Sequence, residues 1–228
     1  MNVLVAGAGG GIGSACVRSV RAAGGVVHEV DADTVDITVP GGAERAVREA
    51  SEALGPLDGV VHAIGMSGRR YGDGPLTSCT DEAWARVHRV NHESVFRLLR
   101  AAIPAMAPGG SIVVIGSTLA TTLDRDFLTA AYISAKAALV PLIRTAAWEA
   151  APAGVRVNLV SAGLVDTPMA GRALGDAAIV ARMPELMPLG GRPCRPDEVA
   201  EAVGWLLRSG SGRTTGAVIP VDGGWHLR

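Results

Sequence analysis

The sequence predicts one α/β domain of the doubly wound type, in which a parallel β-sheet is covered by helices on both faces. Short runs rich in valine and isoleucine alternate with longer runs rich in alanine, leucine and arginine. This alternation is typical of parallel strands joined by crossover helices. The strand-like runs are continuously apolar, as expected for strands buried on both faces. The length of 228 residues fits one domain, so we expect residues 1–228 to form a single unit.

The strand-like runs in chain order are VLVAG, VVHEVD, GVVHAIG, SIVVIGS, VRVNLVSAG and AVIPVDGG. A further strand-like piece, Val35 to Ile37, follows the second run after only about four residues, whereas a parallel crossover takes about a dozen or more. We therefore expect a Rossmann-like sheet of six to seven strands, with the second crossover helix missing and the third strand reduced or absent. A helix from about Gly42 to Leu54 then leads to the strand Val60 to Ile64.

Two later helices are predicted from apolar spacing and composition. The first begins near Thr80 and carries an apolar stripe on which one amide, Asn91, also falls; its apolar members are Trp84, Val87, Val95, Leu98 and Ala102. The second is the alanine-rich run around YISAK, Tyr132 to Lys136. Pro141 lies inside this second run, where a missing N–H group is expected to kink the helix.

Composition and charge exclude several classes of protein. Apolar residues make up 48%, charged residues 19%, and the formal net charge is -1, which gives no electrostatic basis for binding nucleic acid. The three cysteines, Cys16, Cys79 and Cys194, form no CxxC pair, so neither a disulfide framework nor a metal site is expected. No signal peptide or membrane span is recognisable, and we expect a cytoplasmic protein.

Residues with binding chemistry follow the ends of the predicted strands. They are Gly7, Asp31, Gly65, Ser117, Gly163 and the DGG at 222–224. Ligands of open α/β sheets bind outside the carboxyl ends of the strands. We therefore expect these scattered residues to meet at one crevice.

The segment GAGGGIG, residues 7–13, follows the first strand and opens a helix. Glycines allow a tight turn and a close backbone approach, and a helix N-terminus offers free amides to a pyrophosphate. The predicted contacts are Gly7, Gly10, Gly11, Ile12 and Gly13. The alternative is a plain glycine turn.

Asp31 closes the second strand, where a carboxylate can bind the adenosine ribose hydroxyls and repel a 2′-phosphate. Residues 7–13 contain no arginine or lysine that would bind that phosphate. Both observations favour NAD over NADP. The alternative for Asp31 is an ordinary turn aspartate.

Seven short segments resemble, in order, the motifs of the short-chain dehydrogenase/reductase family. AGAGGGIG resembles the family's TGxxxGIG, with Ala6 in place of threonine, and VHAIG at 61–65 stands where the family has NNAG. The others are VN at 90–91, IGS at 115–117, YISAK at 132–136, NLVSAGLVDTPM at 158–169 and VDGGW at 221–225. The resemblance covers nearly the whole chain.

The resemblance implies a catalytic group of Asn91, Ser117, Tyr132 and Lys136. Tyr132 would exchange a proton with the substrate oxygen, while Lys136 would lower the phenol pKa and hold the nicotinamide ribose. Lowering that pKa from about 10 to about 7 needs roughly 4 kcal/mol of phenolate stabilisation. Ser117 would bind the substrate oxygen, with Thr118 as the alternative. Asn91 would complete a proton path to Lys136, or would be a satisfied structural amide.

The resemblance also implies further contacts to the dinucleotide. Asp36 and Ile37 would meet the adenine, and Thr167 and Val165 would meet the nicotinamide carboxamide; Ala63 and Gly65 complete the set. His62, which replaces an asparagine of the family, is expected to be a hydrogen-bonded packing residue. Loops around Met169, Met183 and Met187 are expected to close over the substrate.

We therefore expect an NAD(H)-dependent oxidoreductase that interconverts a secondary alcohol and a ketone. Two alternatives remain: a lyase or isomerase on the same scaffold, and a non-catalytic dinucleotide-sensing regulator. The presence of all four catalytic residues disfavours the regulator. The resemblance also implies a homodimer or homotetramer built from helices near residues 81–107 and 130–150.

Overall fold

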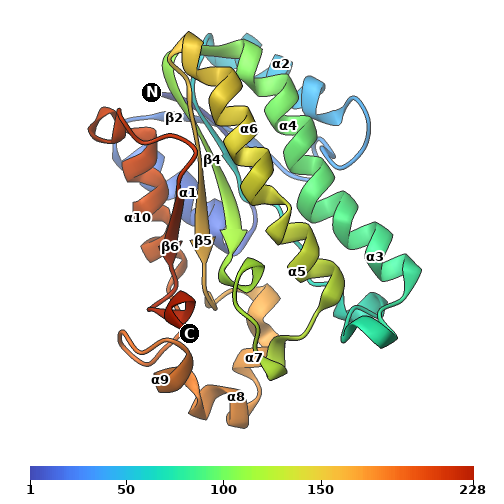
Figure 1. Ribbon diagram of the computed structural model, residues 1–228. Helices are drawn as coiled ribbons and strands as arrows, with labels where there is room; N and C mark the ends of the chain where they lie inside the picture. The colour runs from blue at the N-terminus through green and yellow to red at the C-terminus, as the bar shows by residue number, and fades with distance from the viewer.

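Six parallel strands form one sheet in the order β2-β1-β3-β4-β5-β6 in the computed structural model, which describes all residues 1–228 (Figure 1). The strands are β1 (Asn2–Ala6), β2 (Val26–Val30), β3 (Leu57–His62), β4 (Met106–Ser117), β5 (Arg156–Ala162) and β6 (Val218–Val221). All six predicted strands are present, and the predicted doubly wound α/β fold is confirmed.

Helices cover both faces of this sheet. The helices are α1 (Gly11–Ala22), α2 (Gly42–Leu54), α3 (Asp81–His88), α4 (Ser94–Ala102), α5 (Ala130–Ala137), α6 (Leu139–Ala150), α7 (Gly171–Leu174), α8 (Ala177–Ala181), α9 (Met183–Leu186) and α10 (Pro196–Leu207). In Figure 1, α1 and α10 lie on one side of the sheet, and α4 and α6 lie on the other.

Alternate residues of each strand supply two separate cores. Val3 and Val5 of β1 pack in a cluster with α1 and α10, whereas Leu4 and Ala6 pack in a second cluster with α2, α4 and α6. Because both faces are covered, most positions of each central strand carry an apolar residue. This burial on both faces explains the continuous valine and isoleucine runs of the sequence.

The second crossover helix is missing and the third strand is absent, as the short spacing predicted. Between β2 and α2 the chain makes turns, in which the amide of Val35 donates to the carbonyl of Asp31 at 2.8 Å. Val35 and Ile37 are buried in the cluster with α2 instead of forming a strand. β2 is therefore an edge strand of the sheet.

The predicted helix from Thr80 is divided into α3, a π-helical turn (Arg89–Glu93) and α4. The hydroxyl of Thr80 caps α3 by accepting from the amide of Ala83 at 3.1 Å. Most of the predicted apolar stripe is buried, but Trp84 was wrongly included: it is 43% exposed and lies against the ring of His88. The π-turn explains the error, since an inserted residue rotates α3 relative to α4.

The predicted kink at Pro141 is confirmed as a break at Ala138, between α5 and α6. Proline at 141 has no N–H group to donate to the carbonyl four residues earlier, so the regular helix cannot pass this point. The break lies just after the helix that carries Tyr132 and Lys136.

The strands run downward in Figure 1, and the short helices α7, α8 and α9 lie beyond their carboxyl ends. These helices belong to the segment between β5 and α10. No helix has the length and apolar character needed to cross a membrane. The three cysteines are free thiols.

Candidate active site

A cavity of about 570 Å³ opens at the carboxyl edge of the sheet. Loops that follow β1, β3, β4 and β5 line it. Of the strand-end residues expected to meet there, Gly65, Ser117 and Gly163 line the cavity, whereas Gly7, Asp31 and the DGG at 222–224 do not. The predicted residues that line it are Gly10, Gly11, Ile12, Ala63, Gly65, Ser117, Tyr132, Lys136, Val165 and Thr167. The predicted residues outside the lining are Gly7, Gly13, Asp31, Asp36, Ile37 and Asn91.

Gly7 and Gly13 shape the glycine loop from behind the cavity wall. Gly7 has φ of 86°, and a Cβ there would lie 2.8 Å from the carbonyl carbon of Ala63. A Cβ on Gly13 would overlap the carbonyl oxygen of Gly7. These two glycines are therefore required by packing. They hold the start of α1 at the cavity, where the helix has no side-chain cap.

Asp31 lies beside the glycine loop, and its Oδ2 accepts from the amide of Gly9 at 2.5 Å. Asp36 is engaged by its own turn, with Oδ1 accepting from the amide of Thr38 at 2.8 Å. Ile37 has no exposed surface. Among the residues expected near the adenosine, Asp31 is thus the one in contact with the glycine loop.

Ser117 ends β4 and Thr118 follows it, but their hydroxyl groups have different partners. The hydroxyl of Thr118 donates to Asp222 Oδ2 at 2.8 Å. Ser117 Oγ accepts from the amide of Leu119 at 3.2 Å and also interacts with the side chain of Tyr132. Of the two alternatives, Ser117 is therefore the one beside the phenol.

Tyr132 and Lys136 lie on one face of α5, as the i, i+4 spacing predicted. Lys136 Nζ is 6.0 Å from the centre of the Tyr132 ring and donates to the carbonyl of Ile115 at 3.0 Å. Burial lowers the pKa of Lys136 to about 8. Burial also raises the pKa of Tyr132, and the hydrogen bond with Ser117 opposes this rise. The expected lowering of the phenol pKa by Lys136 is not present in this arrangement.

Asn91 stands behind the cavity wall in the π-turn and is fully buried. Its Oδ1 accepts from the amide of Met66 at 3.1 Å, and its Nδ2 donates to the carbonyl oxygens of Met66 and Val87 at 3.1 and 3.0 Å. A Cβ on Gly65 would lie 3.2 Å from Asn91 Oδ1 and 3.7 Å from Lys136 Nζ. Because Gly65 has no side chain, the space between the amide of Asn91 and the ammonium group of Lys136 stays open.

His62 is buried, and its Nε2 forms a hydrogen bond with Ser94 Oγ at 2.9 Å. Burial, with a smaller effect from the charge of Lys136, lowers the pKa of His62 to about 3. The ring is therefore neutral, in agreement with the packing role expected for it.

Asp73 is a positioning residue that sequence reasoning missed. Its two carboxylate oxygens accept from the amides of Ala131 and Tyr132, each at 3.0 Å. These amides belong to the first turn of α5, whose own N-cap residue, Thr129, forms no side-chain cap. A long-range cap thus fixes the start of the helix that carries Tyr132.

Thr167 packs against the glycine loop, since a Cβ on Gly11 would lie 2.6 Å from Thr167 Cγ2. Met169 lines the cavity, but Met183 and Met187 are buried core residues and do not face it. Sequence reasoning also missed lining residues beyond the motifs, namely Arg69, Arg70, Phe127 and Arg172, and gave no role to Trp225 of the VDGGW motif. Arg69 and Arg70 follow shortly after the carboxyl end of β3, and this position in the sequence could have predicted that they lie near the cavity.

Residues 16–226 match a family model described as Enoyl-(Acyl carrier protein) reductase. The chain belongs to the short-chain dehydrogenase/reductase family. The membership predicted from the motifs is thus confirmed. The match extends over most of the fold and includes every residue of the proposed catalytic group.

Relatives in this short-chain dehydrogenase/reductase family include an uncharacterized NAD-dependent oxidoreductase of Mycobacterium tuberculosis, 37% identical over 91% of this chain and 76% of the relative. A cis-4-hydroxycyclohexanecarboxylate dehydrogenase of Sinomonas cyclohexanicum is 31% identical over 97% of this chain and 95% of the relative. A short-chain type dehydrogenase/reductase of Mycobacterium ulcerans superposes with a TM-score of 0.88 at 30% identity, over 99% of this chain and 90% of that structure.

Replacing Lys136 by methionine removes an amine whose pKa burial lowers to about 8 from an ordinary 10.5. Between pH 8 and pH 10.5 the Lys136 amine holds its proton in the unfolded chain but loses it in the folded protein. The buried amine therefore lowers the unfolding free energy by its full amount below pH 8, and by less and less as the pH rises to 10.5. The unfolding free energy of the wild type, minus that of Lys136→Met, should rise with pH by on the order of 3 kcal/mol. Urea titrations of both proteins between pH 8 and pH 10.5 measure this difference in unfolding free energy. A constant difference would contradict the prediction.

Proposed function

We propose that the protein is an NAD(H)-dependent oxidoreductase that interconverts a secondary alcohol and a ketone. One observation carries the proposal: Tyr132, Ser117 and Lys136 meet the glycine loop in the same cavity. If Tyr132 and Lys136 were an ordinary exposed pair on a helix, they would not be expected to line a cavity beside the uncapped start of α1. Oxidation of an alcohol needs a proton acceptor beside a hydride acceptor, and this cavity offers a place for both.

The residues present fit a dinucleotide. α1 begins at the cavity with no side-chain cap and no acidic residue in its first turn, so its free amides suit a pyrophosphate. Asp31, beside Gly9, suits the ribose hydroxyls of NAD and disfavours a 2′-phosphate. The Mycobacterium tuberculosis relative is named as NAD-dependent, which supports the same choice. When bound, NAD supplies the acceptor or donor for the hydride.

Tyr132 handles the proton in this proposal. In the oxidation direction the phenolate accepts the proton of the substrate hydroxyl, and in reduction the phenol returns it to the carbonyl oxygen. Ser117, the hydrogen-bond partner of Tyr132, binds the same substrate oxygen and stabilises the charge that develops there. Lys136 holds its charge close to the phenol and, on moving from the Ile115 carbonyl, favours the phenolate.

The cavity wall also favours a substrate with an apolar body. Leu119, Phe127, Met169 and Trp225 line the cavity beside the catalytic group. Such side chains exclude water from the reacting atoms. The Sinomonas relative is named for a hydroxylated cyclohexanecarboxylate, which is a secondary alcohol on an apolar ring.

The Tyr132→Phe variant tests the function. It should lower kcat for oxidation of the best secondary alcohol by about 100- to 10,000-fold, because the proton acceptor is lost. NAD binding, measured by calorimetry, should change little. Net NADH formation in the wild type excludes a lyase, an isomerase and a simple sensor. Tyr71→Phe, which alters the chain's other tyrosine, is the matched control. Equal NADH production by wild type and Tyr132→Phe would refute the assigned role.

Asp31→Ala tests the cofactor preference. Loss of a charge-assisted hydrogen bond and of repulsion toward a 2′-phosphate should reduce the preference for NAD over NADP by about 10- to 100-fold. Fluorescence titrations with NADH and NADPH measure both dissociation constants. Asp33→Ala removes an equal charge two residues away at an exposed position. If the wild type binds NADPH as tightly as NADH, the assignment of NAD is wrong.

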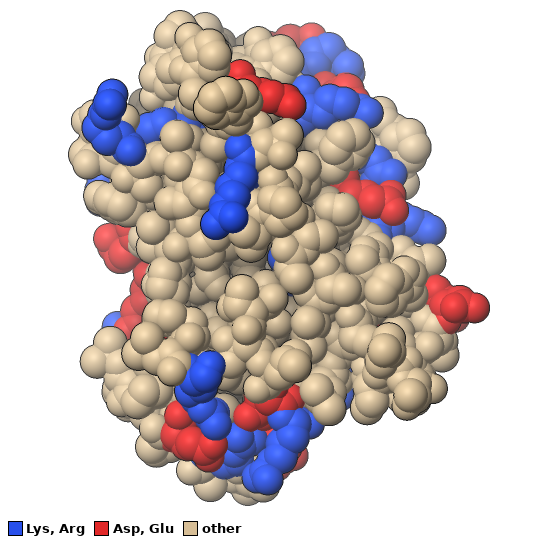
Figure 2. Space-filling model, viewed as in Figure 1, with Lys and Arg blue, Asp and Glu red and all other residues tan.

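We also propose a cytoplasmic homo-oligomer assembled through α4 and α6. Phe96 on α4 is 44% exposed, Trp148 on α6 is 83% exposed, and Figure 2 shows a largely uncharged surface over the adjoining α5. Such apolar surface suits a subunit interface.

Sedimentation velocity should give a dimer or tetramer for the wild type. The double change of Phe96 and Trp148 to glutamate should shift it toward monomer, because charge would be buried in the interface. Val26→Glu, on the exposed edge strand, should leave the assembly intact. A monomeric wild type would exclude the proposal.

A further inference from the structure

The wall of the cavity carries positive charge and no negative charge. Three arginines, Arg69, Arg70 and Arg172, line it together with Lys136, whereas the lining contains no aspartate or glutamate. None of the three arginines forms an ion pair with a carboxylate elsewhere, since the pairs of the structure involve other arginines. The cavity therefore has an excess of cations that a ligand can balance.

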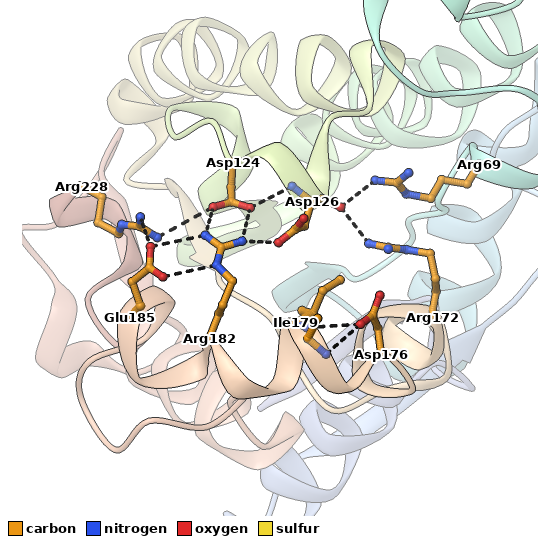
Figure 3. Close-up of polar contacts among 10 residues, drawn as sticks. Arg69, Asp124, Asp126, Arg172, Asp176, Ile179, Arg182, Glu185 and Arg228 are labelled. Atoms are coloured by element: carbon orange, nitrogen blue, oxygen red, sulfur yellow. Dashed lines mark hydrogen bonds and ion pairs between the residues drawn. The ribbon is translucent and has the colours of Figure 1, made fainter.

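Arg69 and Arg172 converge on one point. Both donate from Nη2 to the carbonyl oxygen of Asp126, at 3.1 and 3.0 Å (Figure 3). They come from different loops, one after β3 and one at the start of α7. Burial lowers the pKa of Arg69, and the charge of Arg172 lowers it further. Arg69 Nη2 also donates to the carbonyl oxygen of Leu128 at 3.4 Å. Neutral carbonyls thus hold the two like charges, and most of the N–H groups of both side chains have no acceptor within the protein.

The nearby carboxylates do not neutralise this pair because another arginine binds them. Arg182 forms ion pairs with Asp124, Asp126 and Glu185. Figure 3 shows these carboxylates directed toward Arg182, on the far side of the 124–126 segment from Arg69 and Arg172. Figure 2 shows acidic and basic side chains lying together at the lower end of the molecule. The guanidinium of Arg70 lies over the ring of Tyr71, 4.7 Å from its centre, and takes no part in the contact with Asp126.

Apolar side chains contact the arginine pair and line the same cavity as the catalytic group. The guanidinium of Arg172 lies 5.7 Å from the centre of the Phe127 ring. Phe127 in turn packs edge to face on Trp225 at 5.0 Å. Both aromatic side chains line the cavity together with Ser117 and Tyr132. A ligand that fits this arrangement has a polar reacting end, an apolar body and an anionic end.

We propose that Arg69 and Arg172 bind a carboxylate of the substrate, so that the enzyme acts on secondary alcohols or ketones that also carry a carboxylate group. The guanidinium fork matches a carboxylate and can bind it through two hydrogen bonds. The reaction itself rests on the function proposed above, whereas the carboxylate subsite rests on the arginine pair. The subsite would discriminate strongly against neutral analogues, because their binding would leave the cations unbalanced.

The test compares hydroxy carboxylates of increasing chain length with their methyl esters, using the wild type, Arg69→Gln and Arg172→Gln. The wild type should prefer each well-fitting acid over its ester in kcat/KM by about 10- to 100-fold, and the variants should lose this preference. The acid-to-ester ratio is insensitive to partial loss of folded protein. Arg69→Lys and Arg172→Lys should recover part of it. Arg125→Gln, which removes an exposed unpaired charge next to Asp126, is the control and should keep the ratio.

Binding measurements separate this proposal from the reaction. Calorimetry of the same acids with Tyr132→Phe and NAD should show binding that weakens by the same factor in each arginine variant, even if no alcohol is oxidised. That result would support the subsite while the proposed reaction failed. If the wild type oxidised acids and esters equally well, the proposed carboxylate subsite would be wrong, whereas the proposed oxidoreductase reaction would still hold. Weaker NAD binding with an unchanged acid-to-ester ratio would instead assign the arginines to the cofactor, and would also overturn it.

Discussion

The buried ammonium group of Lys136 is the interaction on which the geometry of the site depends. Its Nζ binds the carbonyl of Ile115 near the end of β4, and so joins the helix that carries Tyr132 to the strand that carries Ser117. An amine in this position is costly to bury, as its lowered pKa indicates. A purely structural site would favour an apolar residue here. A buried lysine here is consistent with the role proposed for it, in which its charge serves the phenol and a bound cofactor.

Residues outside the cavity, Asp73 and Asn91, hold the elements around Tyr132 and Lys136 in place. Asp73 caps the first turn of α5 from a loop 58 residues earlier in the chain, and Asn91 fills the π-turn opposite Gly65. The Asp73 contact joins the β3–β4 connection to the β4–β5 connection, whereas the Asn91 contacts lie within the β3–β4 connection. The proposed catalytic side chains Ser117, Tyr132 and Lys136 thus come from a strand and a helix, while the arginines of the proposed substrate subsite come from the loop after β3 and from the short helix α7.

Much of this architecture could be predicted because it depends on local pattern. Continuous apolar runs gave the strands, four residues were too few for a crossover, and i, i+4 spacing brought Tyr132 and Lys136 together. Contacts between distant segments left no such pattern. Arg69 and Arg172 could be recognised as neighbours in one cavity, and Asp73 as the cap of α5, only once the fold was known. Trp84 was misassigned because a π-turn changes the helical phase. Met183 and Met187 showed that a loop without periodicity can still supply core residues.

The shortened connection after β2 leaves one margin of the sheet without a covering strand, and such a margin can pair with another chain. On β2 this hazard is limited by charge: Glu29 is exposed and pairs with Arg21 at 2.6 Å. The opposite margin, β6, contains Pro220, which has no N–H group to offer to an incoming strand. Growth of the sheet from one molecule into the next is thus opposed by an ion-paired charge at one margin and by a proline at the other, which leaves the helical surfaces as the better place for the proposed subunit contacts.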